Sequence, residues 1–308
     1  MRPLRSYLQD IEFVEISFHY QLETPRILPL FPELLLRSTL HQTGLEVLDP
    51  EPFERLFTPP LPDDPTALRR YQRPAPPFAF CPQSANPTMT ATDRGIISCH
   101  LFGAGIELLD PLVKTMAEIH PFLLANRQRQ GQLITVSATD AAGNVITIWQ
   151  KGMGKCIEPP RITAAWRFDS LPASTTEWCL EFFTPARLLT QKKPLFRPAF
   201  HHILPFILRR VTALCYFCNH IEITGATELL ELSAEIKEEA GEWRWHDWRS
   251  HPGGGILSEL GGVCGQLRLK GELPDDLIDL LRLGSLMNIG KGAAYGAGAY
   301  RLTPLPPA

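Results

Sequence analysis

The sequence predicts an α+β fold built from two similar modules in tandem. Strand-like and helix-like segments alternate in both halves of the chain, and their order is similar in each half. A polar stretch at residues 168–175 (FDSLPAST) separates the halves, which places one module at residues 1–170 and the other at residues 171–308. The halves show no plain sequence repeat, so the tandem arrangement rests on the order of elements alone.

The first half predicts an antiparallel sheet with helices on one face. Alternating or β-branched apolar residues predict strands, and apolar residues at helical spacing predict helices. The expected elements are a strand at 11–22, a helix at 31–44 that ends at Gly44, a strand at 95–103, a helix at 108–128, and a hairpin of strands at 132–140 and 144–152. This order fits the split βαβ arrangement.

Prolines crowd residues 49–87 (DPEPF, TPPLPDDP, RPAPPF). Strand-like sequence of the same module follows this stretch. We therefore interpret it as a long, semi-rigid insertion within the first module and not as a linker between domains.

The second half repeats the alternation of strands and helices. The expected elements are a strand at 176–189, a helix at 198–217 with Pro205 as a kink or in its first turn, strands at 242–248 and 263–271, a helix at 272–284, and a last strand at 298–302. A glycine-rich loop precedes the last strand.

Bulk composition narrows the classes of function. Over 308 residues, 44% are hydrophobic and 20% charged, which predicts a globular protein. The formal net charge is −3, so a nucleic-acid partner must be argued from a local basic patch. The N-terminus lacks a signal-peptide core and no run approaches the roughly 18 apolar residues of a membrane span, which predicts a cytoplasmic protein.

Cysteine usage gives no sign of a metal site. Seven cysteines without a secretory signal suggest reduced thiols. Cys215 and Cys218, with His220 nearby, form at most half of a zinc site, and no second pair with zinc spacing exists. We interpret both as small core residues, and we expect neither a metal nor a cofactor.

Charge is strongly segregated in the second half. No Asp or Glu occurs between Phe182 and His220, whereas residues 228–242 are acidic. The basic residues of the acid-free segment are Arg187, Lys192, Lys193, Arg197, Arg209 and Arg210. Such a segment predicts contact with RNA phosphates; the alternative is that these are ordinary solvated side chains.

The glycine-rich loop lies within residues 283–302. Its glycines, which flank Lys291, are Gly284, Gly290, Gly292, Gly296 and Gly298. The run lacks the Lys-Ser/Thr pair of a P-loop and the third glycine of a dinucleotide fingerprint. Two interpretations stay open: close approach to a phosphate, and tight packing of the loop on the sheet.

Several spaced motifs of the second half resemble a known family. They are residues 183–188 (FTPARL), 208–214 (LRRVTAL), 245–250 (WxxWRS), 260–265 (LGGxxG) and the final glycine-rich loop. In this order they resemble the CRISPR-associated precursor-RNA endoribonucleases of the RAMP superfamily. The resemblance covers residues 176–302 and is thinner in the first half, and it implies two ferredoxin-like, RNA-recognition-type domains.

The chain departs from the family pattern in two places. Met287 and Asn288 stand before the last glycines, where the family often has a histidine. Residues 250–252 (SHP) replace the tyrosine and second basic residue that usually follow the tryptophan–arginine segment.

The resemblance implies metal-independent cleavage of CRISPR repeat RNA by its own 2′-OH, leaving a 2′,3′-cyclic phosphate and a 5′-OH. It points to His41 as general base, with Arg37 one helical turn earlier, and Tyr20 beside His19 orienting the sugar. The alternative is that His41 is an ordinary histidine on the surface of a helix. The expected RNA contacts are Arg187, Lys192, Lys193, Arg197, Arg209, Arg210, Arg249, Gly290, Lys291 and Gly292.

The implied partners are CRISPR repeat RNA, its processed product and other subunits of a CRISPR effector complex, while a monomer and a homodimer both remain open. Two other functions compete with the nuclease. One is a non-catalytic RNA-binding subunit of an effector complex, and the other is a small-molecule or protein-binding α+β protein that shares only the glycine-rich ending.

Overall fold

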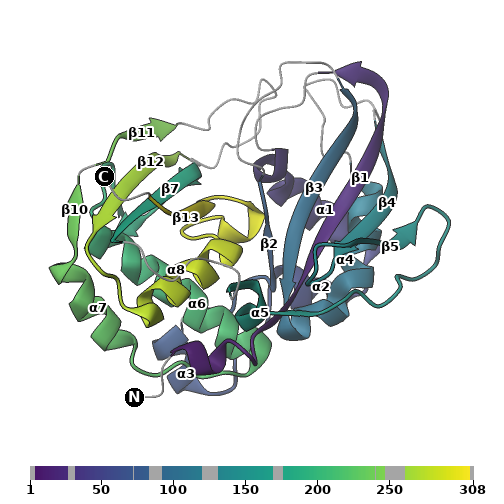
Figure 1. Cartoon of the computed structure of the whole chain (residues 1–308). Coiled ribbons are helices and arrows are strands. Elements are labelled where there is room, and N and C mark those ends of the chain that lie inside the picture. Colours follow the sequence, from purple (N-terminus) through teal and green to yellow (C-terminus); the bar gives the residue numbers. More distant parts are fainter. Residues whose placement is uncertain are drawn as a thin grey trace. The chain divides into compact units, whose positions relative to one another are not determined.

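The computed structural model describes residues 4–26, 32–71, 73–82, 92–119, 131–168, 176–239, 241–246 and 261–305. The chain divides into two compact units (Figure 1). We call Glu12–Ile162 the N-unit, and Met1–Ile11 together with Thr163–Ala308 the C-unit. Each unit combines helices with an antiparallel sheet, which confirms the predicted α+β class.

The N-unit has the strand order of a ferredoxin-like fold. Its strands are β1 (Glu12–Arg26), β2 (Phe78–Phe80), β3 (Thr92–Phe102), β4 (Gly131–Thr139) and β5 (Val145–Gln150), and short β6 (Ile162–Thr163) pairs with β1. The sheet order is β2-β3-β1-β4-β5, and these neighbours are antiparallel. Helices α1 (Leu36–Val47) and α4 (Leu109–Glu118) lie on one face (Figure 1). Strand β5 extends the four-stranded pattern at its edge.

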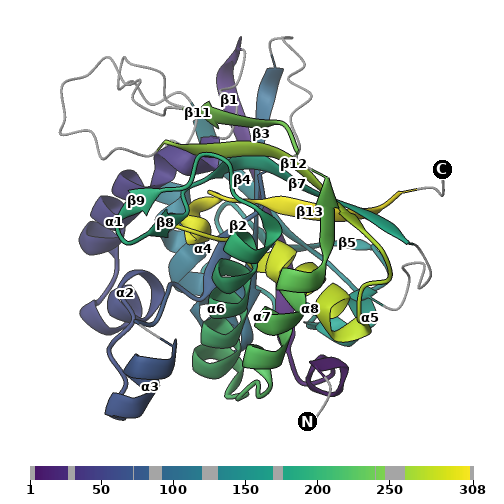
Figure 2. The same cartoon turned by 90° about the vertical axis from the view of Figure 1, so that its left-hand side faces the viewer.

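The C-unit repeats this order. Its main strands are β7 (Glu177–Ala186), β10 (Lys237–Glu239), β11 (Trp243–His246), β12 (Gly262–Lys270) and β13 (Tyr300–Pro304), in the order β10-β12-β7-β13, with β11 also on β12. Helices α6 (Phe200–Asn219), α7 (Ala226–Glu235) and α8 (Asp275–Met287) lie on one face of the sheet, and α5 (Ala164–Phe168) precedes β7 (Figure 2). A small hairpin joins β8 (Leu189–Thr190) to β9 (Lys193–Pro194). The predicted tandem of ferredoxin-like domains is confirmed.

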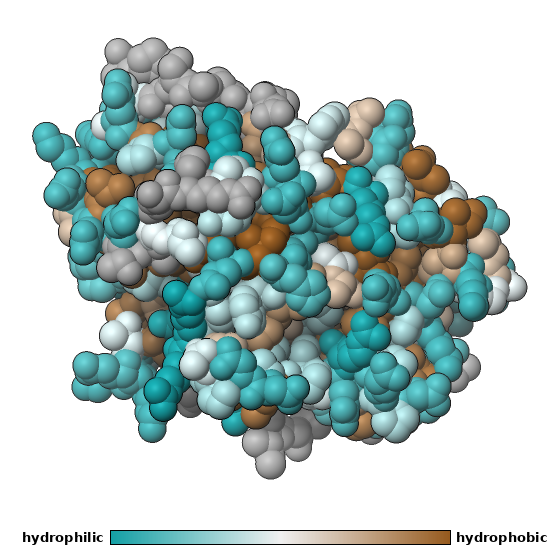
Figure 3. Space-filling view, turned by 90° about the horizontal axis from the view of Figure 1, so that it is seen from below, coloured by the Kyte–Doolittle hydropathy of each residue, from teal (hydrophilic) through white to brown (hydrophobic). Residues whose placement is uncertain are grey.

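The period-two pattern of the central strands explains the core. In β1, Ile16, Phe18 and Tyr20 are fully buried, while the residues between them are less so. The alternate residues Trp178, Leu180 and Phe182 of β7 are also fully buried. The face drawn in Figure 3 is mostly hydrophilic, with hydrophobic residues in small groups, as expected when most large apolar side chains are buried. No helix among the described residues is long and apolar enough to cross a membrane.

The proline-rich stretch, expected to be a long, semi-rigid insertion, is partly helical. It contains helices α2 (Pro50–Phe57) and α3 (Pro65–Tyr71). Each begins with a proline, whose fixed φ and missing N–H suit the first turn of a helix. The prolines therefore start these two helices.

Helix α1 also runs past Gly44, where it was expected to end. Gly44 is buried, and a Cβ added there would lie 2.6 Å from the Phe57 ring. Glycine at this position therefore allows α2 to pack closely against α1 and does not end the helix. Of the expected helix at 108–128, α4 covers Leu109–Glu118, and residues 120–130 lie outside the described part of the chain.

The first residues of the chain belong to the C-unit. A short 3₁₀ helix (Leu4–Tyr7) buries Leu4 and Tyr7, and the Ala164 N–H donates to the Ile11 carbonyl over 2.9 Å. The chain thus passes from the C-unit into the N-unit after Ile11 and returns to the C-unit at Thr163. The segment from Thr163 to Phe168, expected in the first module, lies in the C-unit.

Candidate nucleic-acid interface

The glycine-rich loop of the C-unit lies directly against the end of β7. The Lys291 N–H donates to the Arg187 carbonyl over 3.1 Å, and the Gly298 N–H donates to the Pro185 carbonyl over 3.0 Å. A Cβ on Gly290 would lie 2.7 Å from the Arg187 carbonyl, and the φ of Gly290 is +83°. The loop thus needs glycine for packing, yet it also places exposed Lys291 beside the basic segment.

The β8–β9 hairpin projects further basic side chains from the same place. Gln191 and Lys192 form its two-residue turn, and both have positive φ, at 50° and 66°. The Leu195 N–H donates to the Leu188 carbonyl over 3.0 Å, which ties the hairpin back to the residue after Arg187. Lys192 and Lys193 are exposed.

An aromatic pair lies next to these cations. The rings of Phe196 and Trp245 have centroids 4.7 Å apart. Trp245 packs on the backbone of Gly261, whose carbonyl accepts a hydrogen bond from Arg187 Nη1 over 3.4 Å. These contacts join the pair to the loop and the hairpin. We call this set the basic–aromatic surface: Arg187, Lys192, Lys193, Phe196, Arg197, Trp245 and Lys291.

Arg210 was predicted to contact RNA, but its guanidinium already bonds to another part of the protein. It is half-buried, and its Nε donates to the Met287 carbonyl over 3.1 Å, at the C-terminus of α8. Burial lowers the pKa of Arg210 to about 10, so it remains charged at neutral pH. A cation here offsets the negative end of the helix dipole, which is a structural role.

The other predicted RNA contacts that are not part of the basic–aromatic surface as defined include Arg209, Gly292 and Arg249. Arg209 is exposed on α6, with its guanidinium 5.5 Å from the centre of the Phe206 ring. Gly292 is half-buried in the glycine-rich loop with a φ of +90°. Arg249 lies outside the described residues.

An acidic side chain from elsewhere in the C-unit contacts the segment that has no Asp or Glu of its own. The Glu238 carboxylate, from β10, accepts the Phe200 N–H over 2.6 Å at the N-terminus of α6. His202 Nδ1 accepts the neighbouring Ala199 N–H over 3.2 Å. Burial, and secondly repulsion by His201, lower the pKa of His202. This helix end is therefore capped by the protein's own groups, a feature that no local sequence pattern reveals.

His41 and Arg37 lie one turn apart on α1 of the N-unit. Arg37 is exposed and His41 is half-buried. The His41 ring meets the Phe53 ring edge-on, with centroids 5.0 Å apart and an interplanar angle of 80°. This contact restricts the imidazole orientation while leaving part of the ring accessible.

Tyr20 does not have the accessibility that a catalytic residue needs. It is 1% exposed, and its hydroxyl donates to the Met116 carbonyl in α4 over 2.8 Å. Burial raises the pKa of Tyr20 well above its usual value. The adjacent His19 points to the opposite face of β1, where its Nε2 lies 2.8 Å from Ser137 Oγ, and burial lowers its pKa.

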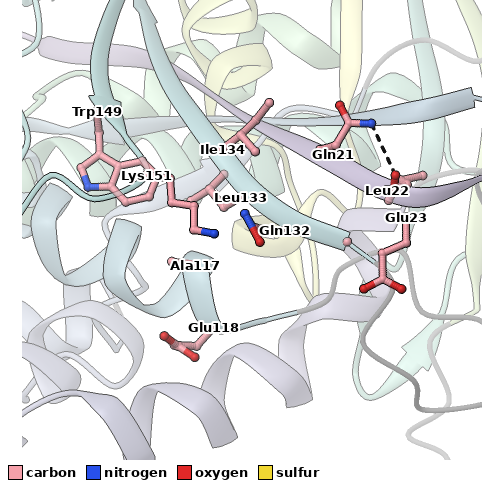
Figure 4. Close-up of a pocket in the computed structure, with 11 residues that line it drawn as sticks. Gln21, Leu22, Glu23, Ala117, Glu118, Gln132, Leu133, Ile134, Trp149 and Lys151 are labelled. Atoms are coloured by element: carbon pink, nitrogen blue, oxygen red, sulfur yellow. Dashed lines mark hydrogen bonds between the residues drawn. The ribbon is translucent and has the colours of Figure 1, made fainter.

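The N-unit also has an open pocket of about 660 Å³ between the ends of β1, β4 and α4 (Figure 4). Its charged lining residues are Glu23, Glu118 and Lys151. Two carboxylates against one ammonium make the pocket unfavourable for a phosphodiester. We therefore do not assign RNA to it.

Within the described ranges, no group of three or more His, Cys, Asp or Glu side chains could hold a metal ion. Cys215 and Cys218 are buried in α6, and burial raises the pKa of Cys218 to about 12. Both are therefore neutral core thiols, as the sequence interpretation expected.

Comparison with known proteins agrees with this architecture. Residues 180–300 match the family described as CRISPR-associated endoribonuclease Cas6, and residues 11–161 match a model described as an N-terminal domain. No curated protein matches the sequence significantly. Residues 180–300 are therefore similar to the Cas6 family of CRISPR-associated endoribonucleases.

Solved structures share the fold at low sequence identity. Thermus thermophilus Cas6 aligns with a TM-score of 0.53 and 14% identity over 95% of this chain and 99% of that chain. A Cas6 product complex aligns with a TM-score of 0.56 and 14% identity, over 94% of this chain and 100% of that chain. A chain of a partial Cas6-RT-Cas1–Cas2 complex aligns with a TM-score of 0.57 and 13% identity, over 96% of this chain and 46% of that chain. At these identities, the similarity concerns the fold alone.

Proposed function

We propose that this protein is a cytoplasmic, metal-independent endoribonuclease that cleaves CRISPR repeat RNA by attack of the RNA's own 2′-OH. The products carry a 2′,3′-cyclic phosphate and a 5′-OH. The match of residues 180–300 to the Cas6 family supports CRISPR RNA processing by an endoribonuclease. The observation that carries the proposal is the basic–aromatic surface, because an RNA-processing enzyme must first hold a phosphodiester chain.

In this mechanism His41 acts as the general base that takes the 2′-OH proton. Imidazole suits this task because it titrates near neutral pH. The edge-on contact with Phe53 supports the assignment, because it limits the orientations of the His41 ring. Arg37, one turn earlier, supplies positive charge for the phosphorane. Tyr20 has no part in the proposal because its hydroxyl is buried.

Phosphate binding falls to Lys192, Lys193, Arg197 and Lys291, which are exposed, and to partly buried Arg187. A single-stranded site of this kind is expected to lose affinity with added salt, with a log–log slope of about −0.7 for each phosphate contact. Other CRISPR proteins are further candidate partners, because one similar structure is a complex of Cas6, RT, Cas1 and Cas2.

The test is cleavage of the cognate repeat RNA by the full chain in EDTA. His41→Ala should slow cleavage by about 10²- to 10⁴-fold, the range for a lost general base, while binding stays within a few-fold. The matched control is His220→Asn, which removes an exposed histidine at φ +57°, a conformation that asparagine tolerates. Full activity of His41→Ala would exclude His41, and loss of wild-type activity in EDTA would exclude the metal-free mechanism.

One observation favours the alternative, a non-catalytic RNA-binding subunit. Met287 and Asn288, at the place where the family loop often has a histidine, are buried, and Asn288 Nδ2 donates to the Ala293 carbonyl over 3.0 Å. This position offers no second imidazole. The alternative predicts tight, salt-sensitive binding of the repeat with no product in either EDTA or Mg²⁺.

A further inference from the structure

We infer that Phe196 stacks on an unpaired nucleobase of the bound RNA, with Trp245 supporting it from behind. The inference rests on the proposed function, since it takes RNA as the ligand, but it adds a contact to the base where the proposal above considers only phosphates. It also specifies the ligand as a single-stranded segment or a flipped-out nucleotide.

The first observation is the unusual exposure of Phe196. Its side chain is 56% exposed, whereas Phe182 and Phe200 in the same unit are fully buried. A lone exposed apolar residue would need no explanation. Phe196, however, is one member of an aromatic pair whose rings are tilted by 49°. One side of its ring meets Trp245, and much of the rest faces solvent.

The second observation is that the pair is held in place. Trp245 lies in β11, in register with Val263 of β12. A Cβ added to Gly261 would lie 2.6 Å from the Trp245 ring, so the backbone packs directly on the indole. Phe196 follows Leu195, whose N–H is bonded to the Leu188 carbonyl. A ring fixed in this way loses little conformational entropy when a base stacks on it.

The third observation is the charge around the pair. Exposed Lys193 and Arg197 lie on either side of Phe196 in the chain, and Arg187 is linked to Trp245 through Gly261. Cations beside an exposed aromatic ring are the combination that binds single-stranded nucleic acid, because phosphates meet the cations while a base covers the ring. Bases inside an A-form duplex cannot reach such a ring, so the RNA must be unpaired here.

The test compares Phe196→Leu, which keeps an apolar side chain, with Phe196→Trp, which keeps a stacking face. The control is Trp166→Leu, which removes an aromatic residue that is 50% exposed on α5 of the same unit and does not belong to the basic–aromatic surface. The probes are the repeat RNA with 2-aminopurine at single unpaired positions and a fully paired RNA duplex.

We expect Phe196→Leu to weaken binding of the repeat by about 5- to 30-fold, within the range for loss of a stacked base. Quenching of 2-aminopurine at one position should disappear, while the slope of log Kd against log salt stays unchanged, because stacking releases no counterions. Phe196→Trp should restore both signals, and Trp166→Leu should change neither. The paired duplex should bind all variants equally.

The outcomes separate this inference from the proposed function. If the wild-type protein binds no RNA, the proposed function fails. If it binds and cleaves the repeat, but Phe196→Leu leaves affinity and quenching unchanged, only the stacking contact is overturned. The same holds if Phe196→Leu abolishes binding of a CRISPR protein partner while RNA binding stays intact.

Discussion

Whether a basic residue can meet a phosphate depends on where its guanidinium already donates. Arg209 and Arg210 are neighbours in sequence, yet Arg209 is exposed while Arg210 is bonded to the Met287 carbonyl. Their local sequence context is the same, so the sequence alone could not separate them. The difference depends on α8, whose C-terminus lies against one of the two side chains only.

At the residue scale, the structure predicts a pH-dependent stability that originates at Glu33. This side chain is 3% exposed, and Oε2 has no hydrogen-bond partner within the described part of the chain. Burial raises the pKa of Glu33 from 4.5 to about 7. The folded state therefore prefers the neutral acid. Its stabilising contribution is fully present below pH 4.5 and is lost as the pH rises through 7.

Replacing Glu33 with glutamine should remove this loss. Glu33→Gln should be more stable than the wild-type protein at pH 8, by up to about 3 kcal/mol, and the advantage should shrink toward pH 4.5. Urea unfolding at several pH values measures the difference, with exposed Glu54→Gln as the control. A stability difference that does not change with pH would contradict the assignment of the shift to Glu33.

At the scale of the element, two neighbouring lysines of the β8–β9 hairpin are expected to contribute equally to RNA binding but differently to stability. Lys192 has a φ of 66°, a left-handed conformation that suits glycine, whereas Lys193 lies in β9. Lys192→Gly and Lys193→Gly should each make the salt slope of RNA binding shallower by about 0.7. Lys192→Gly should leave stability unchanged or raise it by up to about 1 kcal/mol. Lys193→Gly should lower it.

Salt titrations of RNA binding and thermal unfolding test this pair of variants together. The expected result is an equal loss of RNA affinity in the two variants, with Tm lowered by Lys193→Gly and not by Lys192→Gly. If Lys192→Gly binds RNA as tightly as the wild-type protein, the hairpin does not belong to the interface.

Much of each element was predictable from local pattern, because alternation in β1 and β7 and helical spacing in α6 and α8 depend on neighbours in the chain. Helices α2 and α3 were not predicted, because proline, which begins both of them at Pro50 and Pro65, can either start or prevent a helix. The candidate site was predictable in part. Lys291 and Arg187 lie in contact through the backbone, as the proposed site requires. The sequence also shows that residues 228–242 are acidic, but it could not predict that Glu238 folds back to bind the Phe200 N–H at the start of α6.

At the scale of the whole molecule, the order of elements predicted two tandem modules, and both sheets have the same strand order. It could not predict that residues 1–11 join the C-unit, because their partners lie far along the chain. Tyr7 Oη, for example, lies 3.3 Å from Thr224 Oγ1, and Arg5 forms an ion pair with Asp279 at 3.8 Å.

Deleting residues 1–8 should therefore loosen the C-unit. The deletion removes the buried side chains of Leu4, Tyr7 and Leu8. Amide hydrogen exchange in α8 should become faster, while protection in β1 and β3 stays as in the intact chain. Arg5→Ala, which removes only an exposed partner of the ion pair, should have a much smaller effect. Loss of protection in β1 and β3 alone would contradict this prediction.

Residues 1–11 and 163–308 form one folded unit, although the whole N-unit lies between them in the chain, and this affects the order of folding during synthesis. A ribosome releases the opening segment long before it has made the helices and strands that the segment packs against. The N-unit can fold in the meantime, since all its residues are then outside the exit tunnel. Residues 1–11 are thus made before the N-unit but pack only after it, and their apolar side chains stay in water until the rest of the C-unit has been made.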